Sequence, residues 1–382
     1  MSLPQCSKPD PSCPAVEPAS PNIEPASPNI EPASPKQEGF SARQESLSPE
    51  ENFARRLVGV KEAMEERLKT DKCPKEDRRN FIKVRPLGRG AYGKVVLVEH
   101  LKDHQIYAMK IVNKSSVESR NERIVNEKKM ARACDFKFIV KLHYVYQDSI
   151  HFVFFLKHAF YGSLDVLRWT SDLKNQPTTV RWFAAQLILA VQYLHACDIM
   201  HRDIKPANML IYEDFHLEVT DFQMARICEG YCRAFEFIGT PMYMSPEMRG
   251  GKLYGKYVDW WAVGITLLEI LYDCFPIREP DGRLLGPEKV DRESPAFVLI
   301  ERLLKKKFDQ RLGCLSGGAE DIMKQEWFND IPFPEVYAKK LDFRPVLQPK
   351  KGPPPKADID ADFFTKDPSG LHENWYNSFC SR

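Results

Sequence analysis

The fold is decided by the stretch HRDIKPAN, residues 201–208, followed by Asp221-Phe222 after a short predicted hairpin. Asp203 stands five residues before Asn208 and 18 residues before Asp221. Two carboxylates and an amide carbonyl are hard oxygen ligands, the kind that Mg²⁺ prefers. A loop with no chemical role would carry one such residue by chance, whereas this ordered set predicts a magnesium-assisted reaction site.

A glycine-rich stretch, GRGAYGKV at residues 88–95, lies between two predicted strands, Phe81–Val84 and Val95–Glu99. The GxGxxG pattern alone also occurs in dinucleotide-binding oxidoreductases, where it leads from a strand into a helix. A strand on either side argues for a β-hairpin and against the oxidoreductase. Because glycine has no side chain, the backbone N–H groups of such a hairpin can approach phosphates closely.

A lysine and a glutamate suggest a charge pair at the same site. Lys110 lies in the predicted strand Ile106–Val112, 17 residues after Gly93, where it would point into a cleft and meet phosphate oxygens. A single lysine in a strand is usually just a solvated charge. Glu127, inside the predicted helical stretch Arg123–Arg132, favours the functional interpretation, because an ion pair between the two would hold the lysine in place.

The rest of the pattern indicates two unlike halves. Strands dominate from Phe81, and helical patterns dominate from about Asn121. Three strand pieces interrupt the helical part, at Phe152–Leu156, Met209–Tyr212 and Glu218–Thr220. A small sheet lobe followed by a mainly helical lobe is an α+β arrangement with a cleft between the lobes.

Together these motifs resemble the eukaryotic protein kinases, and the resemblance covers residues 81–328. It implies a bilobed α+β protein-kinase fold, with a small antiparallel β-sheet lobe and a larger helical lobe. It also implies ATP-dependent, Mg²⁺-assisted phosphorylation of protein substrates. The DIKPAN form of residues 203–208 is similar to the serine/threonine kinases, so serine and threonine hydroxyls are the expected acceptors.

The resemblance implies a catalytic role for four residues. Asp203 would be the catalytic base, orienting the substrate hydroxyl and accepting its proton. Lys205 would steady the γ-phosphate. Lys110 would contact the α- and β-phosphates and pair with Glu127.

The resemblance also implies which residues would hold the metal and the nucleotide. Asn208 and Asp221 would be the Mg²⁺ ligands. The residues that would contact ATP are Lys110 and the hairpin residues Leu87, Gly88, Arg89, Gly90, Ala91, Tyr92, Gly93, Lys94 and Val95. Phosphoryl transfer needs mainly charge neutralisation and in-line positioning, and this set would supply both.

Further residues resemble the AGC group, which includes the cyclic-AMP-dependent and the Rho-associated or myotonic-dystrophy-type kinases. The tripeptide DWW at 259–261 begins an almost wholly apolar helix through Leu271, and Asp259 would brace the catalytic loop from beneath. Residues 329–382 resemble the C-terminal extension of this group, with FRP at 343–345 and DFFT at 362–365. The last aromatic cluster, WYNSF at 375–379, lacks the usual spacing.

Gln223 departs from the family pattern, because it follows Asp221-Phe222 where the family has glycine. Glycine gives this turn its backbone freedom. A glutamine would restrict the swing between active and inactive forms, or slow the enzyme. The alternative function is therefore a kinase-fold pseudokinase or scaffold with weak or no activity.

Glu236 stands where AGC kinases carry the phosphothreonine of the activation loop. A carboxylate supplies about half the charge of a phosphate. We expect Glu236 to pair with Arg202, Arg226 and Arg123 and so to hold the loop active without phosphorylation. The alternative is a solvent-exposed glutamate with no such role.

In many AGC kinases, acidic side chains bind arginines that precede the target residue of the substrate, and these contacts set the substrate preference. Glu269 matches one such acid, whereas Ala207 and Ser163 replace two others, with Asp165 close by. We therefore predict a weakened preference for basic substrates.

The N-terminal region has a different composition from the rest of the 382-residue chain. Eleven of the 29 prolines lie in residues 1–50, and the unit EPASPNI repeats between residues 17 and 35. Two prolines per unit forbid the helix that a coiled coil needs, so residues 1–50 are predicted to be a disordered Pro/Ser-rich leader. Serines that precede proline would suit a proline-directed kinase, with an unmodified spacer as the alternative: Ser20, Ser27, Ser34 and Ser48.

Residues 51–80 are predicted to be an amphipathic helix and a linker. Phe53, Leu57, Val60, Ala63 and Leu68 recur near helical spacing, so the helix is expected to cover residues 50–70. A helix of this kind just before a globular domain usually docks on that domain. Binding of a partner is the alternative.

Composition argues against several classes of protein. There is no apolar run of about 20 residues and no signal-peptide pattern, so neither a membrane span nor export is expected. The net charge of +2 argues against a nucleic-acid partner. Ten cysteines without a CxxC pair, Cys228 and Cys232 included, indicate reduced thiols. We expect a cytoplasmic protein, with the nucleus as a further compartment.

Overall fold

The computed structural model describes residues 48–70, 74–90, 93–115, 121–228, 237–275, 277–278, 284–285, 291–340, 343 and 345. They all belong to one compact unit, Leu47–Arg382. Most of the predicted leader lies outside these residues, so its disorder and the modification of its serines stay predictions. None of the described helices combines the length and the apolar character that crossing a bilayer requires.

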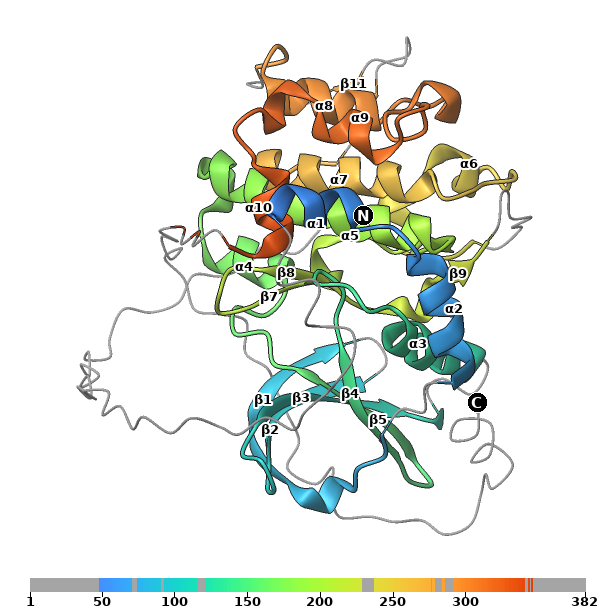
Figure 1. Cartoon of the computed structure of the whole chain (residues 1–382), viewed down its shortest axis with the longest axis vertical. Helices are drawn as coiled ribbons and strands as arrows, with labels where there is room; N and C mark the ends of the chain where they lie inside the picture. The colour runs from blue at the N-terminus through green and yellow to red at the C-terminus, as the bar shows by residue number, and fades with distance from the viewer. Residues whose placement is uncertain are drawn as a thin grey trace, which may run out of the picture. The chain divides into compact units, whose positions relative to one another are not determined.

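The smaller lobe is built on one five-stranded antiparallel sheet with the order β1-β2-β3-β5-β4 (Figure 1). Its strands are β1 (Phe81–Gly90), β2 (Gly93–His100), β3 (Ile106–Asn113), β4 (Leu142–Gln147) and β5 (His151–Lys157). Alternate residues such as Val96, Val98, Met109 and Ile111 share one buried apolar cluster. The predicted strands are confirmed here as β1, β2, β3 and β5. Strand β4 was not predicted, because only Leu142 and Val145 of its six residues are fully buried and the sequence pattern is weak.

The glycine-rich stretch forms the β1–β2 hairpin, as predicted, with Gly90 paired to Gly93. A side chain at Gly93 has no space, because a Cβ there would lie 1.8 Å from the carbonyl oxygen of Ile111 in β3. The sheet continues through the pairing of Val95 with Lys110. The register therefore sets the predicted lysine beside the base of the hairpin.

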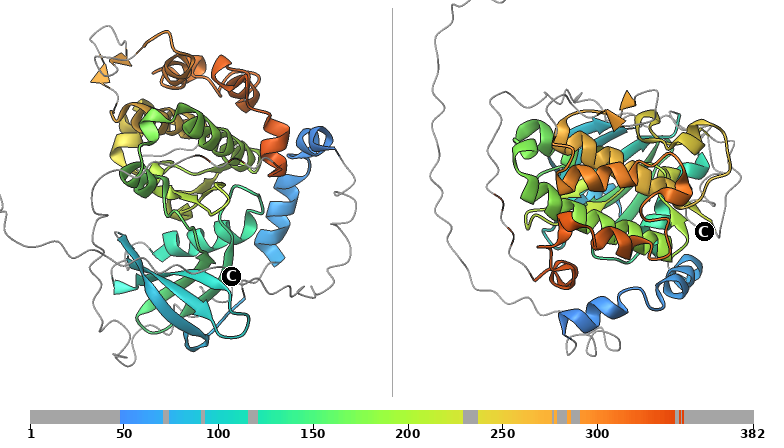
Figure 2. Two further views of the ribbon diagram at one scale, coloured as in Figure 1. Left: turned by 90° about the vertical axis from the view of Figure 1, so that its left-hand side faces the viewer. Right: turned by 90° about the horizontal axis from the view of Figure 1, so that it is seen from above.

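The larger lobe is helical and has two long central helices, α5 (Pro177–Ala196) and α7 (Val258–Tyr272). Figure 2 shows this lobe from the side and from above. Every residue of α7 from Val258 to Leu271 is buried, which confirms the apolar helix predicted to run from Asp259. Shorter helices complete the lobe: α4 (Leu164–Thr170), α6 (Pro246–Arg249), α8 (Pro295–Leu303), α9 (Ala319–Met323) and α10 (Phe333–Ala338).

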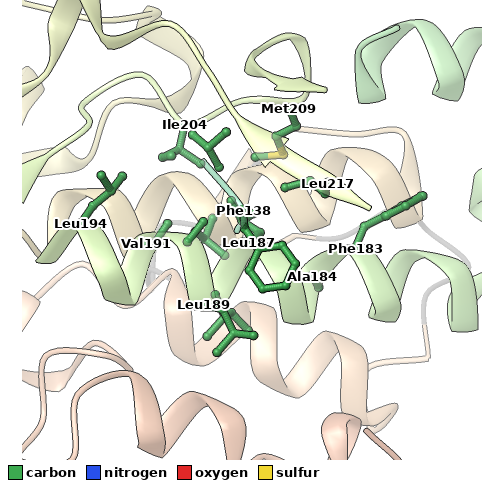
Figure 3. Packing of buried hydrophobic residues seen from close by; sticks show 14 of the residues in the cluster. Phe138, Phe183, Ala184, Leu187, Leu189, Val191, Leu194, Ile204, Met209 and Leu217 are labelled. Carbon is green, nitrogen blue, oxygen red and sulfur yellow. The ribbon is translucent and has the colours of Figure 1, made fainter. Parts of the chain in front are cut away.

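The main core extends from the helices to the catalytic segment (Figure 3). Phe183 and Leu187 of α5 lie in one cluster with Ile204 of the HRDIKPAN stretch and with Met209 just after it. Each of these four side chains is at most 2% exposed. Burying the apolar residues of the stretch anchors its backbone, so its polar residues are held on a fixed support.

The described chain also contains short strands and 3₁₀ helices. Strand β6 (Ile199–Met200) pairs with β9 (Arg226–Ile227), β7 (Met209–Ile211) with β8 (Leu217–Val219), and β10 (Ile277–Arg278) with β11 (Leu284–Leu285). The strand pieces predicted near 209–212 and 218–220 are confirmed as the β7–β8 hairpin. The described 3₁₀ helices are η1 (Arg78–Asn80), η3 (Leu173–Asn175), η4 (Pro206–Asn208), η5 (Phe222–Met224), η6 (Pro241–Tyr243), η7 (Phe308–Gln310) and η8 (Glu326–Phe328).

The single helix predicted over residues 50–70 is wrong, because the segment forms two helices, α1 (Pro49–Arg55) and α2 (Val60–Thr70). The chain breaks at Gly59, which has a left-handed φ of 68° that glycine adopts without strain. Ser48 caps α1 through its side chain, which accepts a hydrogen bond from the backbone N–H of Glu51. Helix propensity on both sides of the glycine explains why the periodicity looked continuous.

Both N-terminal helices dock on the rest of the unit, as predicted. The ring of Phe53 in α1 packs edge-on against Tyr337 of α10, with centroids 6.1 Å apart. Helix α2 packs beside α3 (Asn121–Ala133), as Figure 1 and the left view of Figure 2 show. Met64 of α2 is fully buried, and Arg67 Nε donates to the carbonyl oxygen of Ala133 over 2.7 Å.

The described part of the predicted C-terminal extension is short, comprising residues 329–340, 343 and 345. It contains α10 and Phe343, whose ring stacks on Trp182 of α5 with centroids 4.8 Å apart. The segments DFFT and WYNSF lie outside the described residues. The extension beyond residue 345 therefore stays a prediction.

One expectation about the cysteines is wrong. Cys134, Cys197, Cys274 and Cys314 are free thiols, but Cys228 is disulfide-bonded. Its partner is not among the described residues. The expectation rested on the absence of a CxxC pair, and such spacing does not limit which cysteines the fold brings together.

Candidate active site

Asp259, in the first turn of α7, supports the HRDIKPAN backbone. Its Oδ2 accepts a hydrogen bond from the N–H of His201 and its Oδ1 one from the N–H of Arg202, both over 2.9 Å. His195 Nε2 lies 2.9 Å from Oδ2. Burial disfavours the charged carboxylate, but the hydrogen bond and charge of His195 outweigh it, so the pKa of Asp259 lies below its ordinary value. The predicted brace is therefore present as an ionised, fully buried carboxylate.

Asp203 lies in a dense set of donors just after this brace. Its Oδ1 accepts from the backbone N–H of Thr240 over 2.9 Å and from the Thr240 hydroxyl over 2.7 Å. Its Oδ2 lies 2.8 Å from Lys205 Nζ and accepts from Asn208 Nδ2 over 3.0 Å. Burial would raise the pKa of Asp203, yet Lys205 and Thr240 lower it below its ordinary value. The group is thus an oriented carboxylate that stays charged at neutral pH.

Lys110 and Glu127 meet as the spacing predicted, with Lys110 Nζ 2.6 Å from Glu127 Oε1. The pair joins strand β3 to helix α3. Asp221, at the end of the β8 segment, contributes a second carboxylate, and its Oδ1 lies 3.8 Å from the same Nζ. The lysine therefore connects the sheet, α3 and the segment that begins η5.

Asn208 and Asp221 have ligand atoms that fit a divalent cation. Asp221 Oδ1 is buried and accepts no hydrogen bond within the described part of the chain. Asn208 uses its Nδ2 to donate to the Asp203 carbonyl and carboxylate, so its carbonyl oxygen remains the ligand atom. In the described ranges no cluster of three or more His, Cys, Asp or Glu residues could hold a metal ion by itself. A cation here would need phosphate oxygens as further ligands, which is how Mg²⁺ commonly binds.

The hairpin residues lie partly within the described chain. Leu87, Gly88 and Val95 are half-buried, and Lys94 is buried. The side chain of Arg89 and the exposure of Gly90 are outside the described set, as are Ala91 and Tyr92 altogether. Contact of this hairpin with a nucleotide remains a prediction.

Sequence reasoning missed the role of Thr240. Gly239 has a φ of 99°, and a Cβ there would lie 2.3 Å from the carbonyl oxygen of Arg202. This close approach brings Thr240 onto Asp203. A hydroxyl next to a glycine was the available signal, but the contact itself spans 37 residues.

The predicted pairing of Glu236 lies outside the described residues. Arg202 Nε donates to the carbonyl oxygen of Met224 over 2.6 Å. Arg226 belongs to β9 and pairs with Met200 of β6. These contacts tie the described start of the activation segment to the catalytic loop, while the role of Glu236 stays a prediction.

Comparison with known proteins agrees with this geometry. The family model described as the protein kinase domain matches residues 81–328. The chain is 34% identical over 288 residues to the cAMP-dependent protein kinase catalytic subunit of Dictyostelium discoideum, covering 72% of this chain and 44% of that protein. It is 31% identical over 316 residues to the serine/threonine-protein kinase akt-1 of Caenorhabditis elegans, covering 78% and 56%.

A human relative shows the same relationship. The chain is 30% identical over 311 residues to ribosomal protein S6 kinase alpha-2 of Homo sapiens, covering 77% of this chain and 42% of that protein. The chain spans about half the length of the curated relatives that it matches. The relatives carry the names of AGC-group serine/threonine kinases, in agreement with the branch that the sequence resembles. With a matching domain over most of its length and the bilobed α+β architecture described above, the chain belongs to the protein kinase family.

Proposed function

We propose that this chain is an active protein serine/threonine kinase that transfers the γ-phosphoryl group of ATP to protein hydroxyls with the help of Mg²⁺. The observation that carries the proposal is the set of contacts around Asp203. Lys205, Asn208 and Thr240 all donate to its carboxylate, while the Lys110–Glu127 pair joins strand β3 to helix α3. An inactive scaffold has no need of such a fully connected set of charges.

In phosphoryl transfer the protein residues mainly position the reactants and form no covalent bond to them. Asp203 would orient the substrate hydroxyl and take its proton as the hydroxyl oxygen bonds to the γ-phosphorus and the bond from that phosphorus to the β-phosphate oxygen breaks. Lys205, 2.8 Å from Asp203 Oδ2, would meet the transferred phosphoryl group from the same side. Lys110 would hold the α- and β-phosphates.

Asn208 and Asp221 would hold Mg²⁺, which supplies neutralisation of the phosphate charge when it is bound. The Oδ1 of Asp221, which is buried and accepts no hydrogen bond from the described residues, supports this assignment. A buried carboxylate oxygen without a donor is costly, and a cation would offset that cost. The Lys110 ammonium, 3.8 Å away, is too distant to be a hydrogen-bond donor to it.

The proposal is tested by a phosphorylation assay on purified full-length chain with radiolabelled ATP and Mg²⁺, using arrayed peptides and general protein acceptors. Phosphoamino-acid analysis should find phosphoserine and phosphothreonine and no phosphotyrosine. An absence of incorporation above the Asp203→Ala control would favour the scaffold alternative.

A weakened preference for arginine before the target residue is part of the same proposal. Glu269 is 4% exposed and already ion-paired to Arg168, whose guanidinium lies 2.9 Å away. The hydroxyl of Tyr243 also donates to it. Burial raises the pKa of Glu269, although Tyr243 and Arg168 lower it. A carboxylate that already has two partners attracts a substrate arginine weakly.

We expect peptide arrays to show less than about tenfold discrimination between arginine and alanine at any single position before the acceptor. Arg168→Met keeps the aliphatic stem and frees Glu269, so this variant should select arginine more strongly than the wild type does. Arg181→Met is the matched control. Arg181 forms an ion pair with the exposed residue Asp330, and its replacement should leave the substrate preference unchanged. A strong arginine requirement in the wild type would contradict the prediction.

A further inference from the structure

Side-chain hydrogen bonds join helix α3 and the segment η5. Some are donated by α3 to η5, and one is donated by η5 to α3. Asn126 Nδ2 of α3 donates to the carbonyl oxygens of Phe222 and Ala225 over 3.0 Å and 2.8 Å. These two contacts use only backbone acceptors, so they do not depend on which residue stands at position 223. They fix η5 as a short helical turn against α3.

The second direction depends on Gln223 itself. Its Nε2 donates to Oε2 of Glu127 over 2.9 Å, while Lys110 Nζ lies 2.6 Å from Oε1 of the same carboxylate. Each oxygen of Glu127 thus has a donor from a different element. A glycine at position 223 has no side chain, so it could not donate the hydrogen bond that Gln223 Nε2 donates to Glu127.

Both partners of this contact are buried, so the loss of the hydrogen bond would not be compensated by water. Gln223 is 5% exposed and Glu127 is 6% exposed. Burial raises the pKa of Glu127, and the charge of Asp221 acts in the same direction, whereas Lys110 and the Gln223 hydrogen bond oppose the rise. Removing the amide would leave a buried carboxylate oxygen without its donor, and such orphaned groups are costly.

The backbone at Gln223 does not need glycine in this conformation. The residue with a left-handed φ in this turn is Asp221, at 67°, and Gln223 is not among the non-glycine residues with positive φ. The side chain therefore costs no backbone strain here.

We propose that Gln223 is a positioning residue that holds Glu127, and through it Lys110, so that α3 is kept in its engaged position by contacts within the chain. The inference rests on the proposed phosphotransfer function and adds how the ion pair of that function is maintained. Where the family's glycine leaves Glu127 with Lys110 as partner, this chain adds a second buried donor.

The inference is tested with Gln223→Met, which preserves length and burial but removes the donor, and with Gln223→Gly, which restores the family residue. We expect both variants to raise the KM for ATP about 5- to 20-fold, with a smaller change in kcat. Hydrogen–deuterium exchange of the α3 amides should become faster in both. Met224→Leu, one residue along the same turn, is the matched control and should stay within about twofold of the wild type.

A double-mutant cycle with Glu127→Met distinguishes positioning from simple packing. If Gln223 acts through Glu127, adding Gln223→Met to Glu127→Met should change the KM for ATP less than about twofold. Full additivity would overturn the proposal, as would wild-type values of KM and α3 exchange in Gln223→Met. Exchange and binding of a non-hydrolysable ATP analogue need no phosphotransfer, so they test the inference separately if the wild type lacks kinase activity.

Discussion

Replacing Asp203 with asparagine is expected to lower kcat by about 10²- to 10⁴-fold with little change in the fold. Asparagine has the same shape but no charge, and it can no longer accept the proton of the substrate hydroxyl. One of its two terminal atoms also becomes a donor. That donor would face either the Thr240 donors on the Oδ1 side or Lys205 and Asn208 on the Oδ2 side. Steady-state kinetics with saturating ATP and peptide measure the loss.

The control for this change is Asp214→Asn in the turn between β7 and β8. Asp214 is an exposed carboxylate that pairs with His216, so the same chemical change occurs outside the site. It should leave kcat within about twofold. A non-hydrolysable ATP analogue should bind Asp203→Asn nearly as well as it binds the wild type. If Asp203→Asn retains more than about a tenth of the activity, the assignment of the catalytic base is wrong.

The parts of the site that could be predicted from the sequence are those fixed by local spacing. The β1–β2 hairpin follows from glycines between two strand patterns, and Lys110 follows from its place in β3. The contact between Lys110 and Glu127 is not local, because the two residues are 17 positions apart and lie on different elements. It could be predicted because a charged residue in a half-buried strand needs a partner, and the resemblance to the family names one.

The parts that could not be predicted depend on how distant segments pack. Gln223 was interpreted through its backbone, as a loss of glycine's freedom, because the sequence does not show what a side chain touches. Its actual partner, Glu127, lies 96 residues away and on another element. Thr240 was missed for the same reason. A hydrogen bond between remote residues leaves no periodicity, so only the folded arrangement reveals it.

The helix expected over residues 50–70 shows the opposite error. Its periodicity was real on both sides of Gly59, and a single glycine inside a helical pattern costs only about 1 kcal/mol. The fold makes use of the break, because α1 packs on α10 and α2 packs on α3. A continuous helix could not reach both surfaces. Tertiary contacts, and not propensity, therefore decided where the helix ended.

Replacing Arg311 with methionine is expected to lower the free energy of unfolding by about 3–5 kcal/mol, the largest stability effect that we predict. The Arg311 side chain is fully buried, with its Nη1 and Nη2 lying 2.7 and 3.0 Å from the two carboxylate oxygens of Glu247. It also donates to the carbonyl oxygens of Lys305 and Tyr257. Methionine fills part of the volume but leaves Glu247 charged, buried and without its partner. Urea denaturation followed by tryptophan fluorescence measures the loss.

The double variant Glu247→Gln/Arg311→Met separates the value of the pair from the cost of a lone charge. If the loss in Arg311→Met comes mainly from the unpaired Glu247 carboxylate, the double variant should recover a substantial part of the stability. Asp330→Asn, at the exposed pair with Arg181, is the control and should cost less than about 1 kcal/mol. Equal losses in Arg311→Met and the double variant would mean that packing and the carbonyl contacts of Arg311 dominate. A loss below about 1 kcal/mol in Arg311→Met would contradict the prediction, because a buried carboxylate that loses a bidentate cationic partner should cost more than this.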